Sequence, residues 1–199
     1  AGTRADFVTL LVRTADDPHG GLTFFIIERD TDGFSIGKNL KKMGWWASDT
    51  AELFFDGCRV PVDQRLGDEG SGFIGAMNNF ANERLLLATN CVAIAQLALD
   101  ASIAYARERK AFGRPIGKFQ VNRHRLAEMA TRLAATRSFV STVADKHRRG
   151  EDVTVDAAMA KNNAVSTCSY ITDEAVQIHG GMGYMRESLV ERLYRDARL

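Results

Sequence analysis

The sequence has few cysteines and no excess of charge of either sign. Its three cysteines, Cys58, Cys91 and Cys168, are odd in number, far apart in the chain and outside any Cys-x-x-Cys or metal-ligand pattern. We therefore expect reduced thiols, and neither a disulfide framework nor a metal site. The 26 basic and 25 acidic residues leave a net charge of +1. That balance provides no electrostatic footprint for nucleic acid or an anionic membrane.

Long apolar runs are also missing. The longest apolar stretch, residues 85–106, is interrupted by Thr89, Asn90, Gln96 and Asp100, whereas a membrane-spanning helix needs roughly 20 predominantly apolar residues. We therefore predict no membrane span. The sequence contains no P-loop, nucleophile elbow or catalytic triad pattern either. The apolar share of 45% and the charged share of 26% are typical of a globular protein.

Two halves of the chain differ in their hydrophobic period. Within residues 1–70, short β-rich runs separated by glycine-rich turns predict strands at Phe7–Arg13, Leu22–Glu28, Phe34–Ile36 and Ala51–Phe55. Within residues 71–199 the period is helical, with candidate helices at 72–109, 118–149, 153–180 and from 187 to the chain end. We predict an α+β protein: a small antiparallel, β-barrel-like domain followed by an antiparallel four-helix bundle.

Glu83 is the most informative carboxylate. Helical spacing places Phe80 and Leu87 on either side of it. An apolar environment raises the pKa of a carboxyl group, as a general base working near neutral pH requires. The alternative is a solvated helix glutamate paired with a nearby arginine, and spacing alone leaves both open.

Two further segments could bind a ligand. Arg109 and Phe112 lie at a helix end, followed by Gln120; an arginine there suits a phosphate, or simply offsets the helix dipole. The segment Gln177-Ile178-His179-Gly180-Gly181 follows a helix and not a strand, so it is no dinucleotide fingerprint. Its glycines either cap the helix or let backbone approach a ligand closely.

Taken in order, these segments resemble the acyl-CoA dehydrogenase family along the whole chain. The resemblance is carried by Lys41-Lys42-Met43-Gly44, Ser48-Asp49-Thr50, residues 66–73, Arg109-Lys110-Ala111-Phe112-Gly113, residues 177–181 and Tyr194-Arg195-Asp196-Ala197-Arg198. It implies FAD as cofactor. The positions that match the family's contacts to the ADP part of FAD are Arg109, Phe112, Gln120, Gln177, Ile178, His179, Gly180 and Gly181. They typically reach the flavin of a neighbouring subunit, which implies a homotetramer of paired dimers.

The resemblance also implies a catalytic base and a reaction. The isovaleryl-CoA and long-chain branches take the base from a helix glutamate in a motif like Asn82-Glu83-Arg84-Leu85. Glu83 would remove a proton from Cα of an acyl-CoA thioester while a hydride leaves Cβ for flavin N5, giving a trans-2-enoyl-CoA. Ala81, Asn82 and Arg84 would lie beside the substrate. Electrons would then pass to an electron-transfer flavoprotein.

Alternative functions stay open on the same fold. A flavin oxidase, a flavin monooxygenase and a DNA-associated homologue share it, and a non-catalytic helical interaction module is a further possibility. The balanced charge disfavours the DNA-associated version, and a base at Glu83 disfavours the monooxygenase. We also expect a longer parent protein that adds an N-terminal helical domain and a C-terminal end, in bacterial cytoplasm or the mitochondrial matrix.

Overall fold

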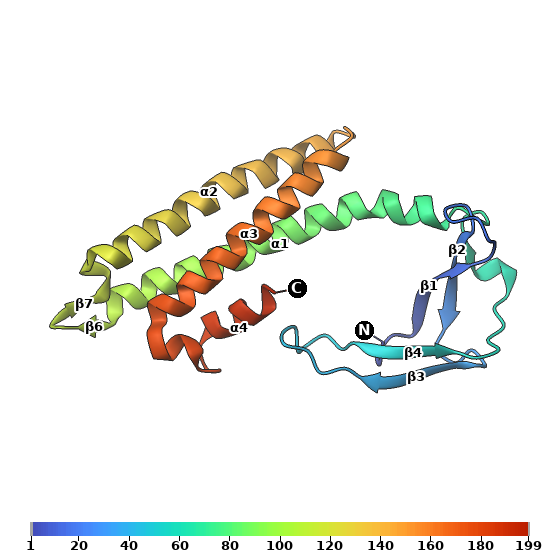
Figure 1. Ribbon diagram of the computed structural model, residues 1–199, viewed down its shortest axis with the longest axis horizontal. Helices are drawn as coiled ribbons and strands as arrows, with labels where there is room; N and C mark the ends of the chain where they lie inside the picture. Colours follow the sequence, from blue (N-terminus) through green and yellow to red (C-terminus); the bar gives the residue numbers. More distant parts are fainter. Residues whose placement is uncertain (1, 199) are drawn as a thin grey trace. The chain divides into compact units, whose positions relative to one another are not determined.

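The structure is a computed structural model that describes residues 2–198. The chain forms two compact units, Ala1–Phe80 and Ala81–Leu199. The first carries the strands of the N-terminal half and the second carries most of the helical residues (Figure 1). The α+β class predicted from the change of period is confirmed, with small antiparallel sheets and four α-helices among the described residues.

Two small sheets make up the first unit. Strands β1 (Phe7–Arg13) and β2 (Leu22–Glu28) pair antiparallel over their full length, and β5 (Arg65–Leu66) adds to the other edge of β2. Strands β3 (Phe34–Asn39) and β4 (Ala51–Phe55) form the second sheet. The turn between β1 and β2 is held by Asp17, whose carboxylate accepts hydrogen bonds from the backbone N–H groups of His19 and Gly20.

The barrel-like part of the expectation is not confirmed. Within residues 2–198 the strands form separate open sheets, and β1 remains an edge strand. The apolar side chains of the two sheets face a hollow of about 230 Å³, which is lined by Leu10, Val12, Phe25, Ile27, Phe55, Cys58 and Val60. A barrel needs every strand to pair on both sides, and the described strands are too few and too short to do so.

The helices follow the predicted spans closely. Helix α1 covers Gly72–Glu108, α2 covers Gln120–Arg148, α3 covers Thr154–His179 and α4 covers Leu189–Asp196. Gly150 and Gly180, just beyond α2 and α3, have φ of 78° and 58°, the left-handed backbone that ends a helix at little cost only for glycine.

Two details differ from the prediction. Helix α4 does not run to the chain end: it ends at Asp196, where the N–H of Ala197 closes the last turn on Leu193 and Arg195. A short hairpin of β6 (Lys110–Ala111) and β7 (Arg114–Pro115) joins α1 to α2. Two-residue strands leave no periodic pattern in a sequence, so this hairpin was not predicted.

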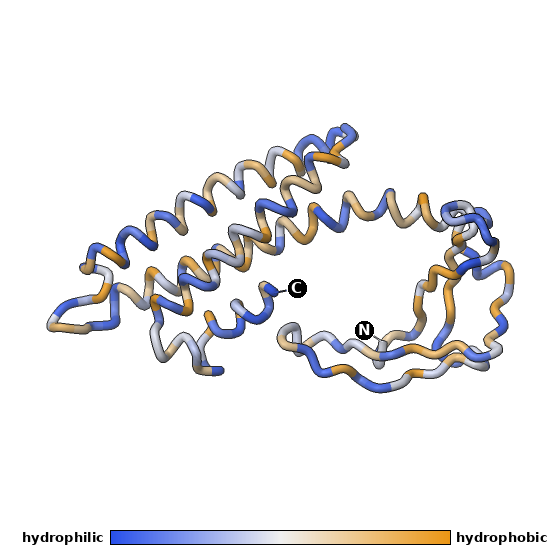
Figure 2. Tube along the Cα trace, viewed as in Figure 1, coloured by the Kyte–Doolittle hydropathy of each residue, from blue (hydrophilic) through white to orange (hydrophobic). Residues whose placement is uncertain are grey.

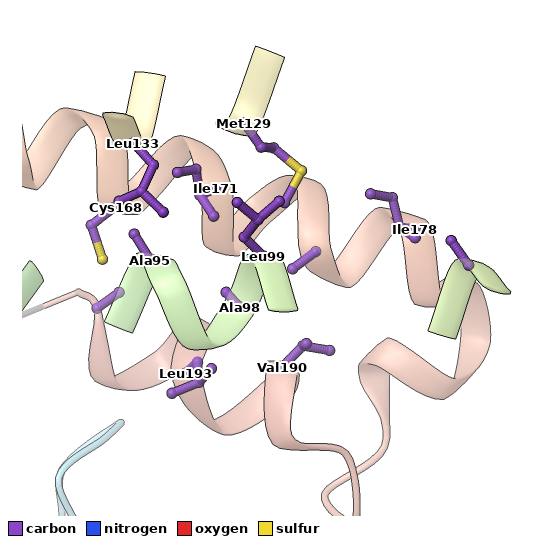
Figure 3. Packing of buried hydrophobic residues seen from close by; sticks show 13 residues of the cluster. Ala95, Ala98, Leu99, Met129, Leu133, Cys168, Ile171, Ile178, Val190 and Leu193 are labelled. Atoms are coloured by element: carbon purple, nitrogen blue, oxygen red, sulfur yellow. The ribbon is translucent and has the colours of Figure 1, made fainter. Parts of the chain in front are cut away.

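Side chains from all four helices share one core in the second unit. Leu99 of α1 packs with Met129 of α2 and Ile171 of α3, while Val190 and Leu193 of α4 close the other side of α1 (Figure 3). Met129 and Ile171 are fully buried. A second cluster around Leu85, Val140, Val143 and Val153 continues the packing toward the α2–α3 connection. The three long helices run antiparallel to their chain neighbours (Figure 1), as the short connections predict.

Helix α1 is more apolar than the sequence argument allowed. By length and composition alone it could cross a membrane, with a mean hydropathy of 1.5 over its most apolar 18 residues, and apolar residues recur along its whole length (Figure 2). A window average tolerates isolated polar residues that interrupt a run. Ala88, Ala95, Ala98 and Leu99 are buried against the other helices, so we interpret α1 as the central helix of the bundle.

Candidate functional site

Glu83 lies on the face of α1 that points away from the bundle core. Leu85 and Ala88 are buried in that core. Glu83 precedes Leu85 by two residues, which places it about 200° round the helix, and its side chain is exposed. Leu86 and Leu87 are 69% and 40% exposed. Phe80, which with Leu87 was the predicted apolar neighbour, is 38% exposed.

Helical spacing alone left a desolvated and a solvated carboxylate both open. In the structure the Glu83 side chain is exposed. Glu83 and its neighbours Asn82, Leu86 and Leu87 are all exposed, so the helical unit by itself does not exclude water from the carboxylate. Ala81 and Arg84 are half-buried. The predicted base and the three predicted substrate-side residues, Ala81, Asn82 and Arg84, form one helical turn at the start of the second unit.

A pocket of about 490 Å³ lies at the opposite end of α1. It is lined by Tyr105, Arg109, Ile116, Ile178, His179, Gly180, Gly181, Met182 and Met185. The end of α1, the last turn of α3 and the 3-10 helix η3 (Gly180–Tyr184) meet there. Five of the eight predicted cofactor residues come together in this pocket: Arg109 joins Ile178, His179, Gly180 and Gly181, which lie far along the chain.

The remaining predicted cofactor residues lie outside the lining of that pocket. Phe112 is at the tip of the β6–β7 hairpin and is 95% exposed. Gln120 is the first residue of α2, Gln177 lies in the last turn of α3, and both are exposed. The structure therefore divides the predicted set into five pocket residues and three exposed ones.

The hairpin tip holds Phe112 in a costly backbone conformation. Phe112 has φ of 51° and Gly113 has φ of 78°, the two left-handed positions that a tight hairpin turn requires. For a bulky side chain this conformation costs on the order of 1 to 3 kcal/mol, and such strain collects at functional sites. The Arg114 guanidinium lies 4.3 Å from the centre of the Phe119 ring, which also contacts Phe112 edge-on. These contacts stabilise the presented aromatic ring.

Glycines leave the backbone of the pocket open. Gly180 has φ of 58° and ψ of −137°, a combination that a side chain strongly disfavours. A Cβ atom placed on Gly180 or Gly181 would meet no atom within 4 Å. The free space above this backbone lies beside the Arg109 side chain. Such a cradle, with a guanidinium and open backbone, fits a phosphate group.

His179 is neutral in this setting. Its Nδ1 lies 2.8 Å from the carbonyl oxygen of Ala175, and its ring stacks on that of Tyr105 with centroids 4.2 Å apart. Burial lowers the pKa of His179, and the bond to Ala175 offsets this only in part. Tyr105 was missed by the sequence analysis. Its position four residues before Arg109, on the same helical face, was the available signal.

The three cysteines remain free, as expected, but two of them are neighbours. Cys91 on α1 and Cys168 on α3 form a thiol hydrogen bond, which lowers the pKa of Cys91 to about 7 and raises that of Cys168. The sequence did not predict this contact, because separation along the chain says nothing about contacts between helices. Among residues 2–198 no group of three or more potential metal ligands is found.

Comparison with known proteins decides the family. Residues 70–199 match the family "Acyl-CoA dehydrogenase, C-terminal domain". The chain belongs to the acyl-CoA dehydrogenase family. Members are flavoprotein oxidoreductases of fatty acid oxidation and are typically tetrameric.

Similar members of the acyl-CoA dehydrogenase family match nine tenths or more of this chain. An acyl-CoA dehydrogenase of Bacillus subtilis is 42% identical over 199 residues, which are 100% of this chain and 52% of the relative. The caffeyl-CoA reductase–Etf complex subunit CarC of Acetobacterium woodii is 41% identical over 90% of this chain and 47% of its own length. A solved probable acyl-CoA dehydrogenase of Mycobacterium abscessus has a TM-score of 0.97 and 49% identity, covering 99% of this chain and 52% of that one. The chain thus spans about half the length of these relatives.

Proposed function

We propose that the intact protein is an FAD-dependent acyl-CoA dehydrogenase with Glu83 as its catalytic base. It would convert an acyl-CoA thioester to the trans-2-enoyl-CoA. Family membership and the placement of Glu83 on an uncovered apolar face of α1 support this function. The helix-borne glutamate further supports the long-chain and isovaleryl-CoA branch of the family.

The exposed leucines beside Glu83 suggest how the base becomes active. Leu86 and Leu87 form an apolar surface next to the carboxylate. An acyl chain seated on that surface would displace water from Glu83. Loss of water raises the proton affinity of a carboxylate, so the substrate itself would prepare the base. In the free enzyme the carboxylate would remain solvated.

The proposed reaction balances in protons and electrons. The Glu83 carboxylate takes the proton from Cα, and the electron pair of that C–H bond forms the new double bond. The hydrogen on Cβ leaves as hydride, with the electron pair of the Cβ–H bond. FAD, when bound, supplies the hydride acceptor at N5. Arg84, Asn82 and Ala81 border the thioester and orient Cα toward Glu83, an alignment on which proton transfer depends.

We assign the pocket at the end of α1 to the ADP part of FAD. Arg109 would pair with a phosphate, and the open backbone at Gly180 and Gly181 would allow close approach. Phe112, Gln120 and Gln177 are exposed around the same end of the bundle. In a homotetramer of paired dimers they would contact the flavin of a neighbouring subunit. The Etf-complex relative supports an electron-transfer flavoprotein as electron acceptor.

Anaerobic flavin bleaching of the full-length protein tests this function. The wild type, Glu83→Gln and, as a matched control, Glu128→Gln are mixed with a panel of acyl-CoA thioesters. Glu128 is an exposed helix glutamate paired with Arg132 on α2. We expect bleaching in the wild type and the control, and none in Glu83→Gln despite bound flavin. Equal bleaching in all three would place the base elsewhere.

The same experiment separates the alternative functions. Admitting oxygen after bleaching distinguishes a dehydrogenase, whose reduced flavin reoxidises slowly, from an oxidase that reoxidises quickly and releases hydrogen peroxide. A protein that retains flavin but is bleached by no thioester would not be an acyl-CoA dehydrogenase. Full-length protein without a flavin spectrum would support a non-catalytic helical module. The free cysteines fit either the bacterial cytoplasm or the mitochondrial matrix.

A further inference from the structure

The Tyr105–His179 pair is the part of the pocket that the proposed function leaves unexplained. The two rings stack nearly parallel, with an interplanar angle of 21° and centroids 4.2 Å apart. Tyr105 comes from α1 and His179 from the last turn of α3. The stack therefore joins the two helices that bring Arg109 and the two glycines into one pocket. A ring held on one face by another ring has little freedom to turn.

The hydrogen bond of His179 determines its tautomer. The carbonyl oxygen of Ala175, 2.8 Å from Nδ1, can only accept a hydrogen bond, so Nδ1 carries the proton. In a neutral ring Nε2 then has a free lone pair and acts as an acceptor. In the charged form both ring nitrogens would be donors. The neutral state therefore means that Nε2 can bind a hydrogen-bond donor of the ligand and not an acceptor.

Nothing charged in the pocket favours a protonated His179. Its lining contributes Arg109 from the residue after α1, apolar Ile116 from the α1–α2 connection, and Met182 and Met185 from η3 and the residue after it. Arg109 is the one charged residue among the described lining residues, and a cation disfavours a second positive charge nearby. Burial acts in the same direction. The pocket thus combines one fixed cation with one neutral acceptor.

We propose that Tyr105 is a positioning residue that holds His179 as the neutral Nδ1–H tautomer, so that Nε2 accepts a hydrogen bond from the ligand. The pocket would then select a phosphorylated ligand that also carries a hydroxyl or amino donor. The ADP part of FAD has both, whereas inorganic diphosphate has only the anion. This inference rests on the proposed assignment of the pocket to FAD, and it goes further by dividing recognition between Arg109 and His179.

Competition with FAD rebinding tests the division. Full-length protein is stripped of flavin, and the Kd values of ADP and of inorganic diphosphate are measured by their competition with FAD, followed by flavin fluorescence. His179→Phe keeps a ring for Tyr105 to stack on but removes Nε2. We expect it to weaken ADP about three- to tenfold, the effect of one lost hydrogen bond, and to leave diphosphate unchanged. Arg109→Ala should weaken both ligands.

Tyr105 is tested by a pair of variants. Tyr105→Leu removes the stack and Tyr105→Phe restores it. With the stack removed, His179 becomes more solvated and charges more readily, so below pH 6.5 diphosphate should bind more tightly while ADP loses its hydrogen bond. Tyr105→Phe should rescue the ADP preference. Tyr170→Leu, another half-buried tyrosine on α3, controls for a general loss of stability, and circular dichroism checks that each variant is folded.

The outcomes separate the two levels of the proposal. If Arg109→Ala changes neither ligand, the pocket does not bind FAD and both proposals fail. If Arg109→Ala weakens both ligands but His179→Phe weakens both equally or neither, the FAD site stands and the acceptor role of His179 is overturned. Tyr105→Leu with wild-type ADP preference at every pH overturns the positioning role of Tyr105.

Discussion

Cys91 and Cys168 share a thiol hydrogen bond between α1 and α3, in the region where the two core clusters of the helical unit meet. The bond stabilises the thiolate of Cys91, whose pKa falls to about 7, and makes Cys168 harder to ionise. Lys161 on α3 contributes a weaker attraction. The two thiols are therefore unequal in reactivity although both lie in helices of the same bundle.

This inequality predicts selective alkylation of Cys91. Since the thiolate is the reactive form, Cys91 should react with iodoacetamide in a pH-dependent manner centred near pH 7, while Cys168 should remain unmodified in the folded protein. Cys168→Ala removes the thiol that donates to Cys91. In this variant the alkylation of Cys91 should begin at a higher pH. Peptide mass spectrometry with Cys58 as internal reference measures all three sites. Faster labelling of Cys168 than of Cys91 would contradict the hydrogen-bond assignment.

Replacing Arg109 should weaken flavin retention. Loss of one charge-assisted hydrogen bond costs about 1.5 to 3 kcal/mol, which corresponds to roughly 10- to 150-fold in affinity. We expect Arg109→Ala to lose FAD during purification of the full-length protein, and Arg109→Lys to lose less. Arg107→Ala is the matched control, because Arg107 is an exposed arginine two residues earlier, in the last turn of α1, and lies outside the pocket lining. Normal flavin content in Arg109→Ala would remove Arg109 from the site.

Asp49 should make the unfolding free energy of the first unit, which carries the sheets, depend on pH in the acid range. Its carboxylate accepts hydrogen bonds from the N–H and hydroxyl of Thr3, at 2.6 and 2.5 Å, and from Arg4 at 3.0 Å. These bonds, those from Thr3 foremost, lower the pKa of Asp49 well below 3.8. A lowered carboxyl pKa contributes stability above the unfolded value and loses it as pH falls toward the folded value.

We therefore expect the urea midpoint of the wild type to fall below about pH 4, near the ordinary pKa of an aspartate. Asp49→Asn should lower the midpoint at pH 7 and flatten its dependence between pH 4 and pH 2. Asp63→Asn, at an exposed carboxylate in the same unit, is the control and should follow the wild type. Parallel acid profiles for Asp49→Asn and the wild type would show that Asp49 contributes nothing.

The shared helical core predicts a large cost for truncating Ile171. This side chain is fully buried between α1 and α2, and Ile→Ala changes in such places cost about 2 to 5 kcal/mol of unfolding free energy. Val155→Ala, at a residue of α3 that is 70% exposed, should cost about 0.5 kcal/mol or less. Urea unfolding followed by circular dichroism at the helix wavelength compares the two. Equal midpoints would refute the packing described for α3.

Local sequence patterns predicted the long helices and most of the strands. Alternating and β-branched runs predicted β1, β2 and β4 with the bounds that the structure has, and Gly150 and Gly180 marked two helix ends because only glycine takes their backbone angles at little cost. The segment around Arg109 and the one around Gly180 were each identified, although spacing alone could not say that they meet.

What spacing could not decide was which surfaces are covered. Helical periodicity placed apolar residues beside Glu83, yet solvent exclusion depends on what lies across from them, and the helical unit by itself leaves Leu86 and Leu87 exposed. The thiol pair of Cys91 and Cys168, the ring stack of Tyr105 on His179 and the open edges of the sheets likewise arise from contacts between distant segments.

By itself the sequence determined the α+β order, the helix and strand spans and the family resemblance, because these depend on period, turn chemistry and motifs within short windows. Only the tertiary structure decided that Arg109 and His179 share a pocket, that Phe112 is exposed on a strained turn, and that the Glu83 side chain is exposed. The physical reason is that burial, proton affinity and ligand geometry depend on neighbours in space. Residues that are far apart in the sequence, such as Arg109 and His179, become neighbours only when the helices pack.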